Sequence, residues 1–395
     1  MGDRSRERVL THAAVLAAAF LFNLGQGVLR PTMPLYLQRA FAANYRMVTW
    51  IPTVFGAGKW IANLPTGYLQ DRVGRRTLMA SGLALIALCD LASVVAPTYL
   101  VFLAWRALAG AGWAMFATVA TTVTVDRPSA ERRGRAVSVL MMSETSGLLA
   151  GTAAGGWVYR DLGITSPLFF EAGCMLLAAL VVGRWMSATP ASRGAVAAAP
   201  DARTLREVIN VPGVVATGVT NALLIAIQTG VLVFLYPLYL ANRAGIGPAA
   251  VGLLISLTVV GRLLALWLGG RASDRWGRLR VLRPALLVYA AVVATVTGIT
   301  DPVALAAWSL LIGATSGFVA PLPTALIGDR VPDGQRGVAI GWLRTMTDGG
   351  QIVGPLVMGA LADGVDLSAP FFAAAALLLA AAWACRDPQR RAVAA

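Results

Sequence analysis

Long apolar stretches separated by short polar connections run through the whole chain, and this alternation restricts the possible fold more than any other feature. Each stretch is roughly 20 residues long, the length that an α-helix needs to cross about 30 Å of hydrocarbon. Hydrophobic residues make up 57% of the sequence and charged residues 13%, whereas a soluble domain is about 25% charged. The sequence therefore predicts a protein built from membrane-spanning segments.

Twelve spans are expected along the chain. They lie near residues 13–37, 48–69, 78–97, 99–123, 136–158, 166–186, 212–240, 249–270, 281–299, 302–326, 338–361 and 368–385. No span keeps the period-two alternation that is typical of barrel strands, so the backbone polar groups have to be satisfied within helices. The predicted fold class is an all-α membrane protein with twelve transmembrane helices.

Arginine placement predicts the orientation of these helices. If the amino end is cytoplasmic, twenty-four arginines fall on that side, and Arg39, Arg46, Arg160 and Arg243 alone fall on the other. Cytoplasmic connections carry the excess of basic residues in membrane proteins, so both termini are expected inside the cell. The net charge of +14 is spread over these connections and forms no single basic face, which argues against nucleic acid as a partner.

The chain contains an internal repeat. With a shift of 203 positions, Gly27 and Pro34 coincide with Gly230 and Pro237, and Trp105 coincides with Trp308. Six expected spans belong to each copy, so the copies enter the membrane in the same direction, as parallel repeats of transporters do. We therefore expect two six-helix bundles, at residues 1–186 and 211–395, joined by a cytoplasmic linker at 187–210.

A charged loop after the second span is repeated at the same shift. In the first copy it contains Gly67, Asp71, Arg72, Gly74 and Arg75, and the second copy includes Asp274 and Arg275. This pattern resembles the signature loop of the major facilitator superfamily. The resemblance implies the two-bundle fold of that family and a cytoplasmic latch in which the aspartates and arginines stabilise one conformation. The alternative is that the arginines only determine topology.

The fourth span carries Arg106 within a motif that resembles one from the drug/proton antiporters of this superfamily. Arg106 lies roughly 10 Å inside the outer boundary at 1.5 Å per residue, where a charge is costly unless it serves a site. The shifted position holds Ser309, so the fold does not require this charge. The resemblance ties Arg106 to proton coupling, and we expect Glu144 or, as second candidate, Asp90 to be its carboxylate. A purely structural ion pair is the alternative.

Two further motifs extend the resemblance. Gly147, Gly151, Gly155 and Gly156 in the fifth span resemble the antiporter motif of the exporters, although Thr152 stands where the family has proline. Pro31 and Pro34 in the first span resemble the corresponding helix 1 motif, and such prolines are expected to break the helix locally. Glycines four residues apart also permit ordinary close packing of helices, which is the simpler explanation.

Polar residues within the spans are candidates for the substrate path. They are Asn23, Gln26, Arg30, Lys59, Gln228 and Arg262. Arg30 and Glu171 lie at similar depth and are expected to pair with each other. Lys59 and Arg262 are related by the repeat, which suggests a shared position in the two bundles.

These features predict a secondary transporter of the bacterial inner membrane, acting as a monomer. The preferred function is proton-coupled export of small, partly apolar molecules, and the alternative is proton-coupled uptake or a lipid-type substrate on the same fold. A membrane enzyme or receptor is disfavoured because the sequence shows no nucleophile with a base, no metal ligands and no phosphate-binding loop. No cofactor is expected.

Overall fold

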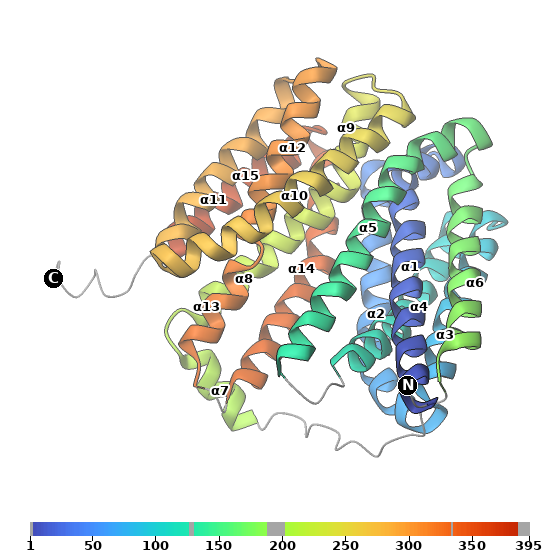
Figure 1. Ribbon diagram of the computed structural model, residues 1–395. Helices are drawn as coiled ribbons and strands as arrows, with labels where there is room; N and C mark the ends of the chain where they lie inside the picture. Colours follow the sequence, from blue (N-terminus) through green and yellow to red (C-terminus); the bar gives the residue numbers. More distant parts are fainter. Residues whose placement is uncertain (1–2, 126–129, 188–201, 333–334, 386–395) are drawn as a thin grey trace. The chain divides into compact units, whose positions relative to one another are not determined.

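The computed structural model describes residues 3–125, 130–187, 202–332 and 335–385, and the regular structure in these ranges is helical throughout (Figure 1). The first copy of the repeat forms α1 (Asp3–Phe41), α2 (Tyr45–Val73), α3 (Arg75–Val94), α4 (Tyr99–Val125), α5 (Ala130–Leu162) and α6 (Ser166–Trp185). A short helix, α7 (Ala202–Asn210), lies in the segment expected to be the linker.

The second copy has the same order with more interruptions. It forms the continuous run α8 (Val214–Ala226), η1 (Ile227–Leu235) and α9 (Tyr236–Asn242), then α10 (Pro248–Trp276), α11 (Arg278–Thr295) with η2 (Val296–Gly298), α12 (Pro302–Val319), α13 (Leu322–Arg330), α14 (Arg336–Gly364) and α15 (Ala369–Ala384). Eleven of the twelve expected spans fall on one helix or on one such run, and the span expected at 302–326 covers α12 and the first part of α13. The prediction of an all-α membrane protein is therefore confirmed.

Eight of the described helical segments are long and apolar enough to cross a membrane by length and composition alone. The shorter α15 is also apolar. The remaining long helices, α2, α5 and α14, are more polar, since they carry residues such as Lys59, Glu144 and Asp348. A charge within a spanning helix is expensive in hydrocarbon, so charged residues in these helices and in the apolar spans are all candidates for function.

The chain divides into two compact units. One unit contains residues 1–43, 53–197 and 247–253, and the other contains 44–52, 198–246 and 254–395. The first turns of α2 therefore belong to the second unit, although the rest of α2 belongs to the first. The start of α10 belongs to the first unit, although the rest of α10 belongs to the second. In the second unit the Asp363 carboxylate accepts hydrogen bonds from the backbone N–H groups of Tyr45 and Arg46, at 2.9 Å each, and so caps the start of α2.

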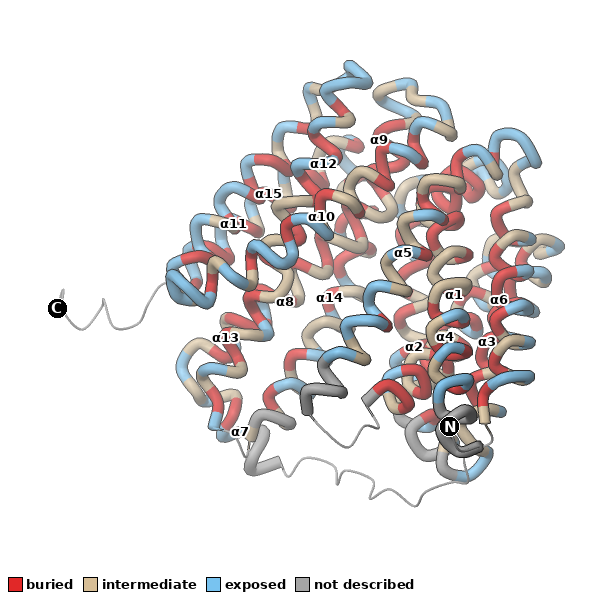
Figure 2. The backbone as a smooth tube through the Cα atoms, in the orientation of Figure 1, coloured by how far each residue is buried: buried red, intermediate tan, exposed pale blue. Residues whose placement is uncertain are grey.

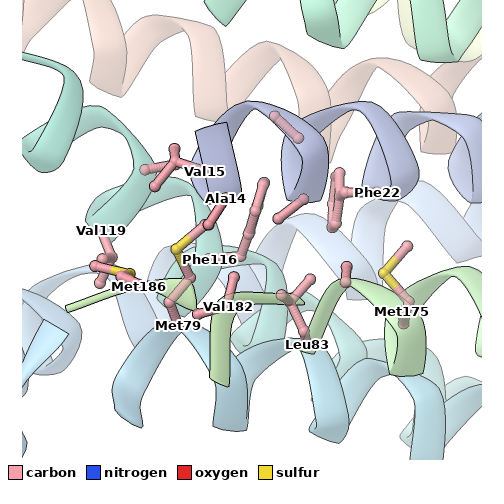
Figure 3. Close-up of a cluster of buried hydrophobic side chains, with 14 of the residues drawn as sticks. Ala14, Val15, Phe22, Met79, Leu83, Phe116, Val119, Met175, Val182 and Met186 are labelled. Carbon is pink, nitrogen blue, oxygen red and sulfur yellow. The ribbon is translucent and has the colours of Figure 1, made fainter. Parts of the chain in front are cut away.

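The core of the first unit lies where α1, α3, α4 and α6 meet. Figure 3 shows Phe22 from α1 beside Phe116 from α4, and their rings are stacked with centroids 4.4 Å apart. Met79 from α3 and Met175 from α6 are fully buried in the same cluster. The backbone drawn in Figure 2 shows buried faces alternating with exposed faces along these helices, as expected for a bundle with a lipid-facing surface.

Close contacts between helices repeat in the two units. A Cβ atom at Gly58 on α2 would overlap the carbonyl oxygen of Ala107 on α4, and one at the repeat-related Gly261 on α10 would overlap that of Leu310 on α12. Ala107 and Leu310 are themselves related by the shift of 203 positions. The internal repeat predicted from the sequence is therefore reproduced at the level of individual helix contacts.

The prediction that Pro31 and Pro34 break the first span is wrong. Helix α1 continues through both Pro31 and Pro34, because lipid strongly favours keeping the other backbone groups hydrogen bonded within the helix. The prolines still remove two backbone donors. The second copy departs from α-helix at the related place, where η1 is a π-helix.

Candidate functional site

A buried cluster of charged side chains joins three helices of the first unit. Arg106 on α4 forms an ion pair with Asp90 on α3, and its Nη1 lies 3.8 Å from Oε2 of Glu171 on α6. The side chains of Arg106, Asp90 and Glu171 are 4%, 0% and 0% exposed, respectively. One guanidinium group and two carboxyl groups are thus enclosed together.

Helix α1 supplies the fourth member of the cluster. The side-chain amide of Gln26 donates a hydrogen bond to Oε1 of Glu171. The helices can approach closely because of Gly25, where an added Cβ would lie 3.2 Å from Glu171 and from the Cβ of Cys174. Gln26 is only half-buried, so it links the enclosed charges to the more open part of α1.

The two carboxyl groups lie beside the same guanidinium group, that of Arg106. Oδ2 of Asp90 and Oε2 of Glu171 are buried, and neither oxygen accepts a hydrogen bond from a donor in the described part of the chain. A proton on either carboxyl group would supply a donor where the described residues provide none. It would also bring the net charge of the cluster from −1 to zero, which is strongly favoured in a buried site.

The cluster belongs to one copy of the repeat only. The positions related to Asp90, Arg106 and Glu171 by the 203-residue shift are Val293, Ser309 and Ala374. All three are buried, and the Ser309 hydroxyl is hydrogen bonded to Tyr236 at 2.6 Å. The same helices therefore pack without any charge in the second unit, and the fold does not require the cluster.

Aromatic rings lie against two buried cations of the first unit, Arg106 and Lys59. The Arg106 guanidinium lies 5.7 Å from the ring centre of Phe102, and the ammonium group of Lys59 lies 4.8 Å from that of Trp113. Such contacts partly compensate a cation for lost hydration. Lys59, a candidate for the substrate path, is thus buried against an aromatic ring rather than open to water.

The structure brings together only part of the predicted site. Glu144 is half-buried on α5, and no ion pair joins it to Arg106 among the described residues, whose carboxylate partners are Asp90 and Glu171. Glu171 was expected to pair with Arg30. It was not among the residues predicted for the proton site. Asp90 and Glu171 share with Arg106 an uncharged repeat mate, but so does Glu144, whose mate is Thr347, so this property alone does not identify the cluster.

The other substrate-path candidates are dispersed. Asn23 on α1 donates a hydrogen bond to the carbonyl oxygen of Ala19 in its own helix, at 3.0 Å. Arg30 is half-buried in the C-terminal third of α1. In the second unit, Gln228 lies in the π-helical segment η1, and the half-buried Arg262 lies on α10.

The predicted latch loop is described only in part. Gly67 and the side chain of Asp71 lie outside the described residues, while Arg72 is exposed and Arg75 is half-buried. Gly74 and its repeat mate Gly277 both have positive φ, at 90° and 89°. Only glycine adopts this conformation without strain, which explains its presence in both copies.

The second copy of the loop shows ion pairs. Arg278 pairs with Asp274 and, at 2.9 Å, with Asp329, and it donates a hydrogen bond to the Ser273 hydroxyl at 2.6 Å. Arg275, expected to act with Asp274, is exposed. These contacts all lie within the second unit.

The glycine motif of α5 forms close contacts along its length. A Cβ at Gly147 would overlap the carbonyl oxygen of Phe20, and one at Gly151 would overlap that of Leu24. Gly155 faces Val28 in the same way, and Gly156 faces Pro248 at the start of α10. The motif therefore packs α5 tightly against α1, the helix that carries Gln26.

Comparisons with known proteins agree with this architecture. The sequence model of the Major Facilitator Superfamily matches residues 15–219 and 218–394. An uncharacterized MFS-type transporter, YcaD of Salmonella dublin, is 26% identical over 323 residues, which cover 80% of each chain. YcaD of an Escherichia coli O7:K1 strain is 26% identical over 280 residues, covering 69% of each.

Solved structures of low sequence identity share the fold. The nucleoside transporter NupG superposes with a TM-score of 0.78 at 13% identity, over 95% of this chain and 98% of its own. A D-xylose–proton symporter superposes with a TM-score of 0.77 at 15% identity, over 96% and 97% of the two chains.

Proposed function

The chain belongs to the Major Facilitator Superfamily and is a multi-pass membrane transporter of small molecules, not an enzyme, and we propose that protons drive it through the cluster of Asp90, Arg106 and Glu171. The observation that carries this proposal is the pair of buried carboxyl oxygens without a donor, beside a single guanidinium group. Uptake of one proton would neutralise the cluster, so the cluster has two discrete states, loaded and unloaded.

Gln26 is the proposed link between the proton and the substrate. Its amide donates to Glu171, and this hydrogen bond favours the charged carboxylate. A substrate that engages the Gln26 amide would remove the donor and so favour protonation of Glu171. The substrate path proposed around Gln26 includes Asn23, Arg30 and Lys59 in the first copy and Gln228 and Arg262 in the second.

Export of small, partly apolar molecules is the proposed direction. The glycine motif of α5, which resembles that of exporters and packs closely on α1, supports it. Proton-coupled uptake is the second candidate, and the likeness to a D-xylose–proton symporter favours it. We propose further that the protein is a monomer in the bacterial inner membrane, with both termini and the linker cytoplasmic.

The test compares two glutamate variants in purified protein reconstituted in liposomes. Glu171→Gln should abolish accumulation of a substrate against its gradient but preserve substrate exchange, which needs no net proton movement. Glu144→Gln, a matched change outside the cluster, should keep accumulation. Substrates are found beforehand by screening neutral, anionic and cationic compounds for substrate-induced proton release from inverted vesicles, and the sign of the proton movement distinguishes antiport from symport.

A second measurement does not depend on the substrate. Infrared difference spectra between acidic and alkaline buffer should contain a carboxylic acid band that disappears in both Asp90→Asn and Glu171→Gln and persists in Glu144→Gln. Unchanged accumulation in Glu171→Gln together with an unchanged band would reject the cluster as the coupling site.

A further inference from the structure

A groove of about 670 Å³ opens between α10, α11 and α12 of the second unit. Its walls are apolar along most of their length, with Leu268 on α10, Val288 on α11 and Phe318 on α12. At one end it is lined by Trp276 and Arg280, which lie at the end of α10 and the start of α11. All these residues belong to one unit, so the groove is a feature of the second bundle by itself.

The internal repeat explains why the groove exists in this unit. In the first unit α3 and α4 pack closely through Gly82, where an added Cβ would lie 2.8 Å from the carbonyl oxygen of Gly112. The repeat mates of Gly82 and Gly112 are Ala285 and Thr315, and both line the groove. Their side chains keep α11 and α12 from the same close approach.

The mouth of the groove is also specific to the second copy. Trp276 and Arg280 replace Val73 and Thr77 of the first copy. Trp276 is 60% exposed, and tryptophan and arginine are the side chains that anchor helices at the membrane–water boundary. On the neighbouring turns of α10, the Arg271 guanidinium lies 4.5 Å from the ring centre of Trp267.

The charge at this end of the groove is positive. Residues 271–283 contain five arginines and one acid, Asp274, which is already paired with Arg278. Arg280 and Arg283 are exposed. A ligand here needs an apolar body and an anionic head.

We propose that the groove binds an anionic phospholipid, with one acyl chain along Val288 and Phe318 and its phosphate at Arg280. Val288 lies eight residues beyond Arg280 in α11, about 12 Å along the helix axis at 1.5 Å per residue. One leaflet contributes half of the roughly 30 Å of hydrocarbon, so the groove matches the depth of a single leaflet. Basic pockets between transmembrane helices bind such headgroups.

The experiment is native mass spectrometry of the full chain in detergent, titrated with phosphatidylglycerol or with phosphatidylcholine of the same acyl chains. Wild type should retain phosphatidylglycerol preferentially. Arg280→Gln should reduce that retention about fivefold, the change expected for one arginine at an anionic lipid surface, and leave phosphatidylcholine unchanged. Val288→Trp, which fills the groove from its exposed side, should reduce binding of both lipids.

Arg283→Gln is the matched control, because Arg283 is exposed on the same helix but does not line the groove. It should behave like wild type. Equal retention of the two lipids, or an equal effect of Arg283→Gln and Arg280→Gln, would overturn the proposal. So would displacement of the lipid by glycerol 3-phosphate alone, which would indicate a headgroup site without the groove, or a dimer that Val288→Trp dissociates, which would indicate a second copy in it.

Discussion

At the scale of single residues, the charged cluster predicts unequal effects of removing its members. Arg106→Gln leaves two buried carboxyl groups without a cation, and breaking a buried pair in this way costs about 3 to 5 kcal/mol. Glu171→Gln leaves Asp90 and Arg106 as a neutral pair that still accounts for both charges. We therefore expect Arg106→Gln to lower the unfolding temperature much more than Glu171→Gln.

The measurement can use the protein's own thiols. Cys89, Cys174 and Cys385 are all buried, so a fluorogenic maleimide reacts as the bundle unfolds. The triple variant with Asp90→Asn, Arg106→Gln and Glu171→Gln carries no charge in the cluster and should regain most of the stability lost in Arg106→Gln. Equal destabilisation by Arg106→Gln and Glu171→Gln would show that the cluster does not hold its charges as described.

At the scale of helices, the close packing of α1 on α5 predicts opposite effects of one substitution at two glycines. Gly147 faces the carbonyl oxygen of Phe20 so closely that a Cβ would overlap it, whereas nothing lies within 4 Å of a Cβ at Gly173 on α6. Gly147→Ala should destabilise by about 1 to 3 kcal/mol through overpacking. Gly173→Ala should stabilise by up to about 1 kcal/mol, because alanine is the better helix former.

Unfolding temperatures of the two alanine variants in the same detergent provide the check. A similar rise in unfolding temperature in both variants would mean that α1 and α5 are not in close contact at Gly147. The packing explanation of the glycine motif would then fail. If Gly147→Ala lowered the unfolding temperature but left proton coupling normal, packing would be supported as the role of the glycine motif. The main argument for export would then be removed.

The elements themselves follow from the sequence more readily than the site does. Apolar runs and arginine-rich connections define each span because hydrocarbon imposes its length on the helices. The continuity of α1 through Pro31 and Pro34 was not predictable from proline rules derived in water. Of the two carboxylates beside Arg106, Asp90 was only the second candidate and Glu171 was missed, because depth along a helix was estimated whereas direction around it was not. Glu144 has a suitable depth, yet Asp90 and Glu171 are the carboxylates that lie beside Arg106.

At the scale of the whole molecule, the arginine distribution predicts the orientation in the membrane. Arg206 lies on α7 and is expected on the side with the excess of arginine, whereas Arg243 lies in an exposed connection that is expected on the other side. A membrane-impermeant maleimide should label Arg243→Cys in sealed right-side-out vesicles and Arg206→Cys only in inverted ones. The three native cysteines are buried and contribute little background. The reverse pattern would invert the topology and the depths assigned to every charged residue.

The repeated latch loop predicts a defect in conformational switching rather than in binding. Asp71 is expected on the cytoplasmic surface, away from the middle of the membrane, so Asp71→Asn should change the balance between conformations and slow transport. Substrate affinity at equilibrium should stay within a few fold of wild type, since the proposed substrate path lies elsewhere. Asp274→Asn is the matched change in the second copy, where Arg278 keeps a second partner in Asp329, and it should slow transport less.

Exchange rates and equilibrium binding of the same substrate separate the two effects. If Asp71→Asn weakened binding strongly but left turnover normal, the loop would be part of the substrate site and not a latch.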